Sequence, residues 1–373
     1  MRLPTLEEGS IDEALFAKMA DYAIAHGINY FDTAAPYHDG MSEVALGKVL
    51  KKYPRDKVYI ATKFPGHQIK KSYKPEAIFN EQLRKCDVDY FDFYLLHCVN
   101  ESTIKTYTDP KWGLVDYFVE QKRLGRIRHF GFSFHGTTEN LKDFLDYCGD
   151  KIEFCQIQLN YLDWTLQDAK AKYELLTERH IPVWVMEPVR GGKLASLSEE
   201  NTQKLQTLRP DESIPSWGFR WLQMLPNVKV VLSGMSNLEQ VVDNVNTFSS
   251  EKPLSEEEIK VVSEVAASLY DCIPCTSCRY CVENCPKGID IPMLLRLFDD
   301  YRFVPNLNAS IRLSMIPPEK LPEACIGCGA CARACPQGIK IPEWMKKFSE
   351  EIKKMPKWED ICRQREADAL KQK

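Results

Sequence analysis

The chain has 373 residues, of which 44% are hydrophobic, a size and composition that suit one large domain and one smaller one. The net charge of −4 is spread over interspersed acids and bases, which argues against nucleic acid as the main partner, and no apolar run reaches the roughly 20 residues of a membrane span. The N-terminus has no apolar signal core, so we expect a cytoplasmic protein whose 14 cysteines stay reduced.

Short apolar segments recur through the first two-thirds of the chain and predict strands at 28–31, 58–63, 91–97, 129–133, 154–159, 183–186 and 228–233. Amphipathic patterns predict helices at 11–26, 42–52, 75–86, 114–124, 138–148, 168–179 and 239–248. Strands that alternate with helices form a parallel sheet, and seven of them favour an α/β fold of the (β/α)8 barrel type. No Gly-x-Gly-x-x-Gly fingerprint is present, which argues against a Rossmann domain.

Titratable side chains stand at the ends of three consecutive predicted strands. Asp32 and Tyr37 follow the first, Lys63 ends the second, and His97 ends the third. In barrels of this type the chemistry sits where strands end and loops begin. Each residue alone has an ordinary explanation, such as a solvated strand end or a core histidine, but four of them in this order predict one catalytic pocket.

Ten of the 14 cysteines lie between Cys272 and Cys362, and eight of these form two copies of one pattern. Both copies read Cys-x₂-Cys-x₂-Cys-x₃-Cys-Pro and continue with Gly-Ile-x-Ile-Pro, an internal repeat. This spacing is typical of bacterial iron–sulfur proteins. Structural zinc would use two Cys-x₂-Cys pairs, and disulfides are disfavoured in a reducing compartment. The predicted metal ligands are Cys275, Cys278, Cys281, Cys285, Cys325, Cys328, Cys331 and Cys335.

Three thiolates of one tight loop can reach three corners of a [4Fe–4S] cube, and in two-cluster ferredoxins the fourth thiolate comes from the last cysteine of the other repeat. On that basis Cys335 completes the first cluster and Cys285 completes the second. Proline-led apolar segments after each repeat predict helices. We therefore expect a barrel over 1–265 and a small, mostly α-helical ferredoxin-like domain over 266–373.

The Asp32, Tyr37, Lys63 and His97 pattern resembles the catalytic tetrad of the aldo-keto reductase family. Further matches are the segment around Ser133, which in the family holds the nicotinamide carboxamide, and the Gln156-x₃-Asn160 motif. A last group resembles the loop and helix that hold the phosphates and adenine: Ser233, Gly234, Ser236, Gln240 and Asn244. With the cysteine repeats, the whole chain is similar to the subgroup that carries a 4Fe–4S dicluster tail.

The resemblance implies carbonyl reduction of a small molecule by NADH or NADPH. Tyr37 would donate the proton, Lys63 would lower the pKa of Tyr37, Asp32 would pair with Lys63, and His97 would orient the carbonyl. The stretch from Ser236 to Asn244 holds no arginine or lysine for a 2′-phosphate, so NADPH is not favoured over NADH. Family members usually have a hairpin and a first barrel strand before the segment that corresponds to Met1–Pro4. We therefore expect the natural start of the protein to lie upstream of Met1.

A nicotinamide gives two electrons and each cluster takes one, which raises the question of a flavin or of a ferredoxin or flavodoxin partner. Three hypotheses follow. The first is an iron–sulfur oxidoreductase of aldo-keto reductase type. The second is an electron-transfer module whose barrel is a non-catalytic scaffold that docks a partner, and the third makes the clusters structural staples or redox sensors.

Overall fold

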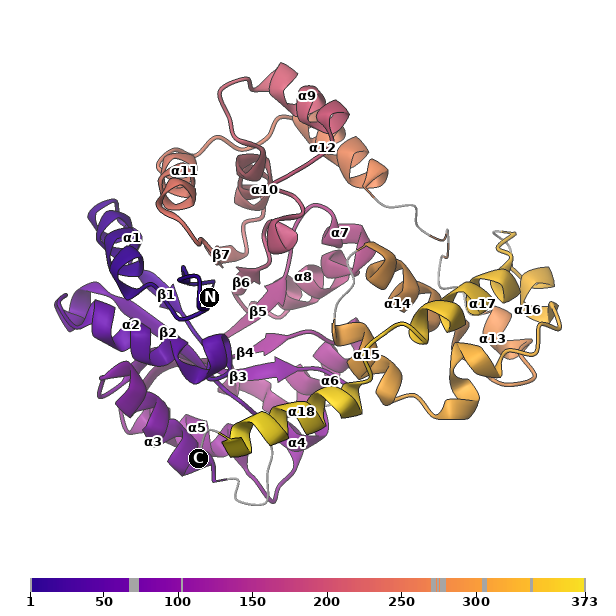
Figure 1. The fold of residues 1–373 in the computed structure, drawn as a ribbon, viewed down its shortest axis with the longest axis horizontal. Helices are drawn as coiled ribbons and strands as arrows, with labels where there is room; N and C mark the ends of the chain where they lie inside the picture. Colours follow the sequence, from indigo (N-terminus) through magenta and orange to yellow (C-terminus); the bar gives the residue numbers. More distant parts are fainter. Residues whose placement is uncertain are drawn as a thin grey trace. The chain divides into compact units, whose positions relative to one another are not determined.

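The computed structural model describes residues 2–66, 74–101, 103–269, 273, 275, 280–303, 307–335 and 338–371. The chain divides into two units, Met1–Val265 and Ala266–Lys373 (Figure 1). Cys278, one of the predicted metal ligands, lies outside the described residues. Within them, no helix combines the length and the apolar character that a membrane crossing requires.

The first unit is built on a parallel sheet whose strands follow one another in chain order (Figure 1). Its strands are β1 (Tyr30–Asp32), β2 (Tyr59–Phe64), β3 (Phe91–Val99), β4 (Ile127–Phe134), β5 (Phe154–Gln158), β6 (Val183–Met186) and β7 (Val228–Val231). Among the described residues, β1 pairs only with β2 and β7 only with β6, so the sheet is open between them. The prediction of a parallel α/β barrel that lacks one strand is confirmed.

Helices alternate with these strands, most of them on the outer face of the curved sheet, and the last two follow β7 (Figure 1). They are α1 (Glu13–Ala25), α2 (Ser42–Leu50), α3 (Pro75–Cys86), α4 (Ile104–Thr108), α5 (Leu114–Arg123), α6 (Thr138–Cys148), α7 (Asp163–Leu166), α8 (Ala169–Glu178), α9 (Glu199–Leu208), α10 (Ile214–Gln223), α11 (Leu238–Phe248) and α12 (Glu256–Ser268). The sequence did not predict α9 and α10, although Ser198 and Ser213 cap their first turns and Pro215 opens the second, which are standard start signals.

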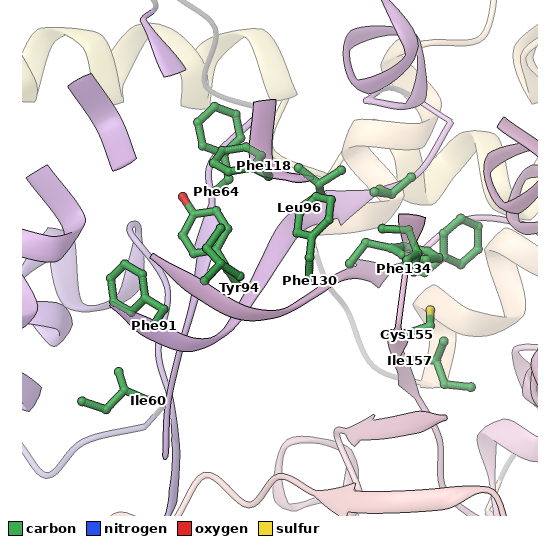
Figure 2. Close-up of a cluster of buried hydrophobic side chains, with 14 of the residues drawn as sticks. Ile60, Phe64, Phe91, Tyr94, Leu96, Phe118, Phe130, Phe134, Cys155 and Ile157 are labelled. Atoms are coloured by element: carbon green, nitrogen blue, oxygen red, sulfur yellow. The ribbon is translucent and has the colours of Figure 1, made fainter. Parts of the chain in front are cut away.

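Successive side chains of a strand point to opposite faces, and this alternation separates two cores. Side chains on the helix side form the main core; among them are Tyr94 and Leu96 of β3 and Phe118 of α5 (Figure 2). Side chains on the concave side form a second cluster, which contains Leu95, Phe154 and Trp184. The same period places polar residues at the carboxyl ends of the strands on the concave side: Asp32, Lys63, His97, Ser133 and Gln156.

The second unit is helical over its described residues. It contains α13 (Tyr280–Glu283), α14 (Ile291–Phe303), α15 (Leu307–Ser314), α16 (Ala330–Arg333), α17 (Ile341–Ile352) and α18 (Trp358–Lys371). Phe298 of α14 stacks on Phe348 of α17, with ring centroids 4.5 Å apart, at the centre of a separate apolar core. The short helices α13 and α16, which carry Cys281 and Cys331, contact each other. The sequence repeat is therefore also a structural repeat.

Candidate active site and metal centre

Lys63 is a deeply buried charge at the carboxyl end of β2. Its side chain is 1% exposed, and its ammonium donates hydrogen bonds to Asp32 Oδ1 at 2.5 Å and to the Thr33 carbonyl at 2.7 Å. Burial lowers the pKa of Lys63. Asp32 and Tyr37 raise it by more than burial lowers it, so the pKa lies above the usual value. Lys63 is thus a permanent cation at neutral pH.

Tyr37 follows β1 in a short 3₁₀ turn, Tyr37–Gly40, and its ring lies against this cation. The Lys63 ammonium is 5.2 Å from the centroid of the Tyr37 ring. The His97 ring meets the Tyr37 ring edge to face, with centroids 6.1 Å apart. The structure therefore brings together all four residues that the sequence predicted as catalytic.

The pKa of Tyr37 differs from the sequence-based expectation. Lys63 lowers it, both as a charge and as a hydrogen-bond partner, but burial of the phenol raises it more, and Asp32 adds to the increase. The net result is a pKa above the ordinary tyrosine value rather than below it. A phenolate in this site is disfavoured by desolvation, which the sequence pattern alone does not reveal.

A cavity of about 900 Å³ opens beside this group. Asp32, Tyr37 and Gln156 line one part of it, and the loop after β7 with the first turns of α11 lines another. Two buried oxygen atoms in its wall, Asp32 Oδ2 and Gln156 Oε1, have no hydrogen-bond partner within the described part of the chain. Unpaired buried acceptors are costly, so the wall is suited to a ligand that donates hydrogen bonds.

The predicted phosphate and adenine residues all lie in this wall. Ser233, Gly234, Ser236, Gln240 and Asn244 line the cavity. Asn244 donates to Ser233 Oγ at 2.9 Å, and Gln240 accepts from the Ser236 backbone N–H at 2.7 Å. These bonds fix the loop on the N-terminus of α11, where backbone N–H groups favour an anion.

Ser133 and Asn160 are placed differently. Ser133 is buried and accepts a hydrogen bond from the Cys98 backbone N–H at 2.9 Å, a bond that leaves its hydroxyl proton for another acceptor. Asn160 lies away from the cavity wall and bonds to Asp163 and to the Glu187 carbonyl at 2.9 Å. Its contact with the cavity is indirect, through the loop that it anchors.

Sequence reasoning did not identify two parts of the cavity wall. The first is the loop after β6, from Glu187 to Gly192, whose paired glycines were a signal that could have been used. The second is Arg2, which lies against Gly234 and whose backbone carbonyl accepts from Ser236 Oγ at 3.0 Å. Arg2 supplies a cation to a region where the sequence of the loop itself has none.

In the second unit, four of the predicted ligands surround one small pocket: Cys285, Cys325, Cys328 and Cys331. Burial raises the pKa of the Cys331 thiol, and the other three thiols raise it further because they are close enough to repel a thiolate. Cys285 comes from the other repeat, so this is the combination expected when the fourth ligand is exchanged. A cluster's positive irons would remove that repulsion, and the donor set therefore fits a [4Fe–4S] group.

The remaining predicted ligands are Cys275, Cys281 and Cys335, with Cys278 outside the described residues. All three described thiols pack in or against the core of the second unit. Among the residues that the structure describes, no three His, Cys, Asp or Glu side chains converge tightly enough to ligate a single metal ion. The thiols of Cys285, Cys325, Cys328 and Cys331 are arranged around a pocket instead.

Curated relatives match the first unit. The chain is 25% identical over 286 residues to the NADH-specific methylglyoxal reductase of Escherichia coli K12, covering 65% of this chain and 85% of the relative. It is 28% identical over 276 residues to the uncharacterized oxidoreductase YqkF of Bacillus subtilis, covering 65% and 84%. The holo form of the aldo-keto reductase AKR11C1 from Bacillus halodurans superimposes with a TM-score of 0.57 at 25% identity, over 71% of this chain and 91% of that one.

Family models account for nearly the whole chain. The model described as "4Fe-4S dicluster domain" matches residues 274–339, which hold both cysteine repeats. The model described as "Aldo/keto reductase family" matches residues 1–267, the unit that holds Asp32, Tyr37, Lys63 and His97. The chain belongs to the aldo/keto reductase family of oxidoreductases and carries a 4Fe–4S domain C-terminal to the aldo/keto reductase domain.

Proposed function

We propose that this protein reduces a small carbonyl compound at Tyr37 with NADH or NADPH, and that its second unit holds two [4Fe–4S] clusters. One observation carries the catalytic part of the proposal. The buried Asp32, Lys63 and Tyr37 group lies in or behind the wall of a cavity of about 900 Å³ whose other wall is the loop and helix from Ser233 to Asn244. Part of this volume is the gap between β1 and β7, and we place the nicotinamide nucleotide in the part between Tyr37 and the loop after β7.

The residues divide the work of proton transfer. Tyr37, whose raised pKa keeps it protonated, donates its proton to the carbonyl oxygen as negative charge develops there. Lys63 stabilises the phenolate that remains, and Asp32 holds Lys63 in place through a 2.5 Å bond. His97 stands edge-on to Tyr37 and orients the carbonyl. A nicotinamide bound in the cavity would supply the hydride.

Several features of the wall support a nicotinamide nucleotide. The unpaired Gln156 Oε1 is suited to the carboxamide N–H₂. Ser133, buried beside Gln156 on the neighbouring strand and not itself part of the lining, would offer its hydroxyl proton to the carboxamide oxygen. Arg2 and the first turn of α11 offer positive potential to phosphates. Since a relative bears the name NADH-specific methylglyoxal reductase, 2-oxoaldehydes are the first substrates to assay and NADH is the first donor.

The thiol pocket supports the second part of the proposal. Cys325, Cys328, Cys331 and Cys285 would hold one cluster, and Cys275, Cys278, Cys281 and Cys335 the other. [4Fe–4S] groups accept and donate single electrons, which is the chemistry that they would supply. We propose a one-electron carrier of the ferredoxin or flavodoxin class as the partner, and a flavin wherever nicotinamide and cluster electrons must be exchanged.

The proposal is tested by assaying anaerobically purified protein for NADH and NADPH oxidation with methylglyoxal and other small carbonyls. Tyr37→Phe should lower kcat by roughly 10²- to 10⁴-fold, the range for removal of a general acid, without changing iron content or nucleotide affinity. Tyr59→Phe, at the exposed amino end of β2, is the matched control and should keep full activity. Equal activity of the Tyr37→Phe variant would refute the catalytic assignment.

An anaerobic titration with NADH and then NADPH, followed through the cluster absorbance, tests the link between the two units. Reduction of the clusters by either nucleotide supports a single electron-transfer system and directs the search to a flavin. If only dithionite reduces them and no carbonyl is turned over, the hypothesis of a non-catalytic scaffold that docks an electron carrier replaces the proposal.

A further inference from the structure

Tyr107, on the short helix α4, places a phenolic hydroxyl between the ends of two strands that carry candidate catalytic residues. Its side chain is fully buried. The hydroxyl contacts the His97 carbonyl at 2.6 Å and the Phe64 carbonyl at 3.3 Å, and it accepts from the Gly66 N–H at 3.1 Å. One side chain thus bonds to the backbone of His97 and to the residue after Lys63.

The Tyr107 hydroxyl fits beside position 66 only because that residue is glycine. A Cβ at Gly66 would stand 2.3 Å from the Tyr107 oxygen and 2.4 Å from its ring carbons. Glycine at this position is therefore what lets the two come close enough to bond. On the other side, the Tyr107 ring packs against Phe144 of α6, with centroids 6.4 Å apart. The ring is held from both directions, so its hydroxyl is a fixed point.

Two further buried hydroxyls act on the next residue along β3. The Cys98 N–H donates to Ser133 Oγ at 2.9 Å, and Thr103 Oγ1 donates to the Cys98 carbonyl at 2.7 Å. Cys98 has a left-handed backbone with φ of +65°, which is unfavourable for a residue with a side chain. The backbone that follows the His97 side chain is consequently held by hydroxyl groups, at the point where the register of the sheet becomes irregular between Leu96 and Val99.

We propose that Tyr107 is a positioning residue that fixes His97 and Lys63 relative to Tyr37 through the backbone of the two strand ends. This inference rests on the proposed carbonyl reduction, because it assigns Tyr107 to the same site. Tyr107 itself does not line the cavity. Removing its hydroxyl takes away the 2.6 Å bond to the His97 carbonyl and leaves the Gly66 N–H and the Phe64 carbonyl with the bond between them, so the link between the two strand ends is lost. A shift of about 1 Å at a catalytic group lowers rates about a hundredfold.

The test compares Tyr107→Phe with Tyr173→Phe in the full-length, cluster-loaded protein. Tyr173 is also buried, and its hydroxyl also accepts from a backbone N–H, that of Asn227 at 3.1 Å, but at the amino end of β7, opposite the site. Tyr107→Phe should lower kcat about ten- to a hundredfold with nucleotide affinity unchanged, while Tyr173→Phe keeps kcat within about twofold. Equal kcat values in the two variants, or a loss confined to KM, would overturn the inference.

A second measurement does not depend on turnover. In protein labelled with ¹⁵N-histidine, the His97 imidazole signals, assigned with His97→Gln, should shift in Tyr107→Phe and stay in place in Tyr173→Phe. Gly66→Ala should shift the same signals, because its methyl group displaces the Tyr107 ring. Unchanged His97 signals in Tyr107→Phe would refute the positioning role. If the wild-type protein reduces no carbonyl, the proposed function fails while these spectra still decide the role of Tyr107.

Discussion

At the scale of single residues, burial and nearby charges together set the pKa values of the candidate site. Burial moves the pKa values of Tyr37 and Lys63 in opposite directions, up for the phenol and down for the ammonium. For Tyr37 burial outweighs the charge of Lys63, whereas for Lys63 the interactions with Asp32 and Tyr37 outweigh burial. Lys63 remains a cation and Tyr37 a neutral phenol, which are the protonation states that the proposed carbonyl reduction needs.

This balance predicts how activity depends on pH. As the acid in reduction, Tyr37 is active below its pKa and inactive above it, and the raised pKa means that kcat/KM should fall only at pH values above 10. Lys63→Met removes the charge that lowers the pKa of Tyr37, so any falling limb should move to still higher pH while the rate itself drops. Lys57→Met, exposed before β2, is the control. A wild-type profile that falls near pH 8 through Tyr37 would contradict this view.

At the scale of elements, close backbone approach decides which residues are allowed. Helices α2 and α3 meet at Gly47, where an added Cβ would stand 2.7 Å from the Cys86 backbone carbon and oxygen. The contacted atoms belong to the backbone, so no side-chain rotation can relieve the overlap. The same two helices lie behind the strand ends that carry Asp32 and Lys63, and Glu43 of α2 is hydrogen-bonded to Thr62 of β2.

Gly47→Ala should therefore destabilise the protein, although alanine is the better helix former by about 1 kcal/mol. The overlap should reverse the sign and lower the free energy of unfolding by about 1 to 3 kcal/mol. Urea denaturation of the first unit, followed by tryptophan fluorescence, measures the change. Lys48→Ala, the exposed neighbour in α2, should stay within about 0.5 kcal/mol of the wild type, and a stabilised Gly47→Ala protein would show that the helices can separate at no cost.

At the scale of the whole molecule, the chain consists of two units with separate apolar cores. The first core lies between the sheet and its helices, and the second lies around Phe298 and Phe348. In the second unit a thiol of one repeat, Cys285, stands with the thiols of the other. At this pocket the two repeats are therefore interdependent, because the four thiols come from both of them.

Exchanged ligation gives a prediction that double variants can test. Cys285→Ser and Cys325→Ser, singly and together, should each leave about four of eight irons, because both residues serve the same cluster. Combining Cys285→Ser with Cys275→Ser should remove both clusters. If each repeat instead binds its own cluster, the first pair loses all iron and the second pair keeps half. Cys362→Ser, outside the repeats, is the control, and iron and sulfide analysis with electron paramagnetic resonance gives the readout.

The order of strands and helices in the first unit was predictable because their patterns are local. The alternation in β4 of Phe130, Phe132 and Phe134 with smaller residues and the amphipathic period of α6 specify both the element and its buried face. The order of strand ends then placed Asp32, Lys63 and His97 side by side. Their catalytic roles stay predictions, and so do the nucleotide contacts and the cluster ligands.

The sequence by itself determined the fold class, the family and the two cysteine repeats, because periodicity and motif spacing are properties of neighbouring residues along the chain. Only the tertiary structure decided the net pKa of Tyr37, since burial is the sum of contacts from distant segments. Only the structure, too, placed Arg2 at the loop after β7 and the Tyr107 hydroxyl between the ends of β2 and β3. Distances of this kind arise from the packing of whole elements, and no local pattern encodes them.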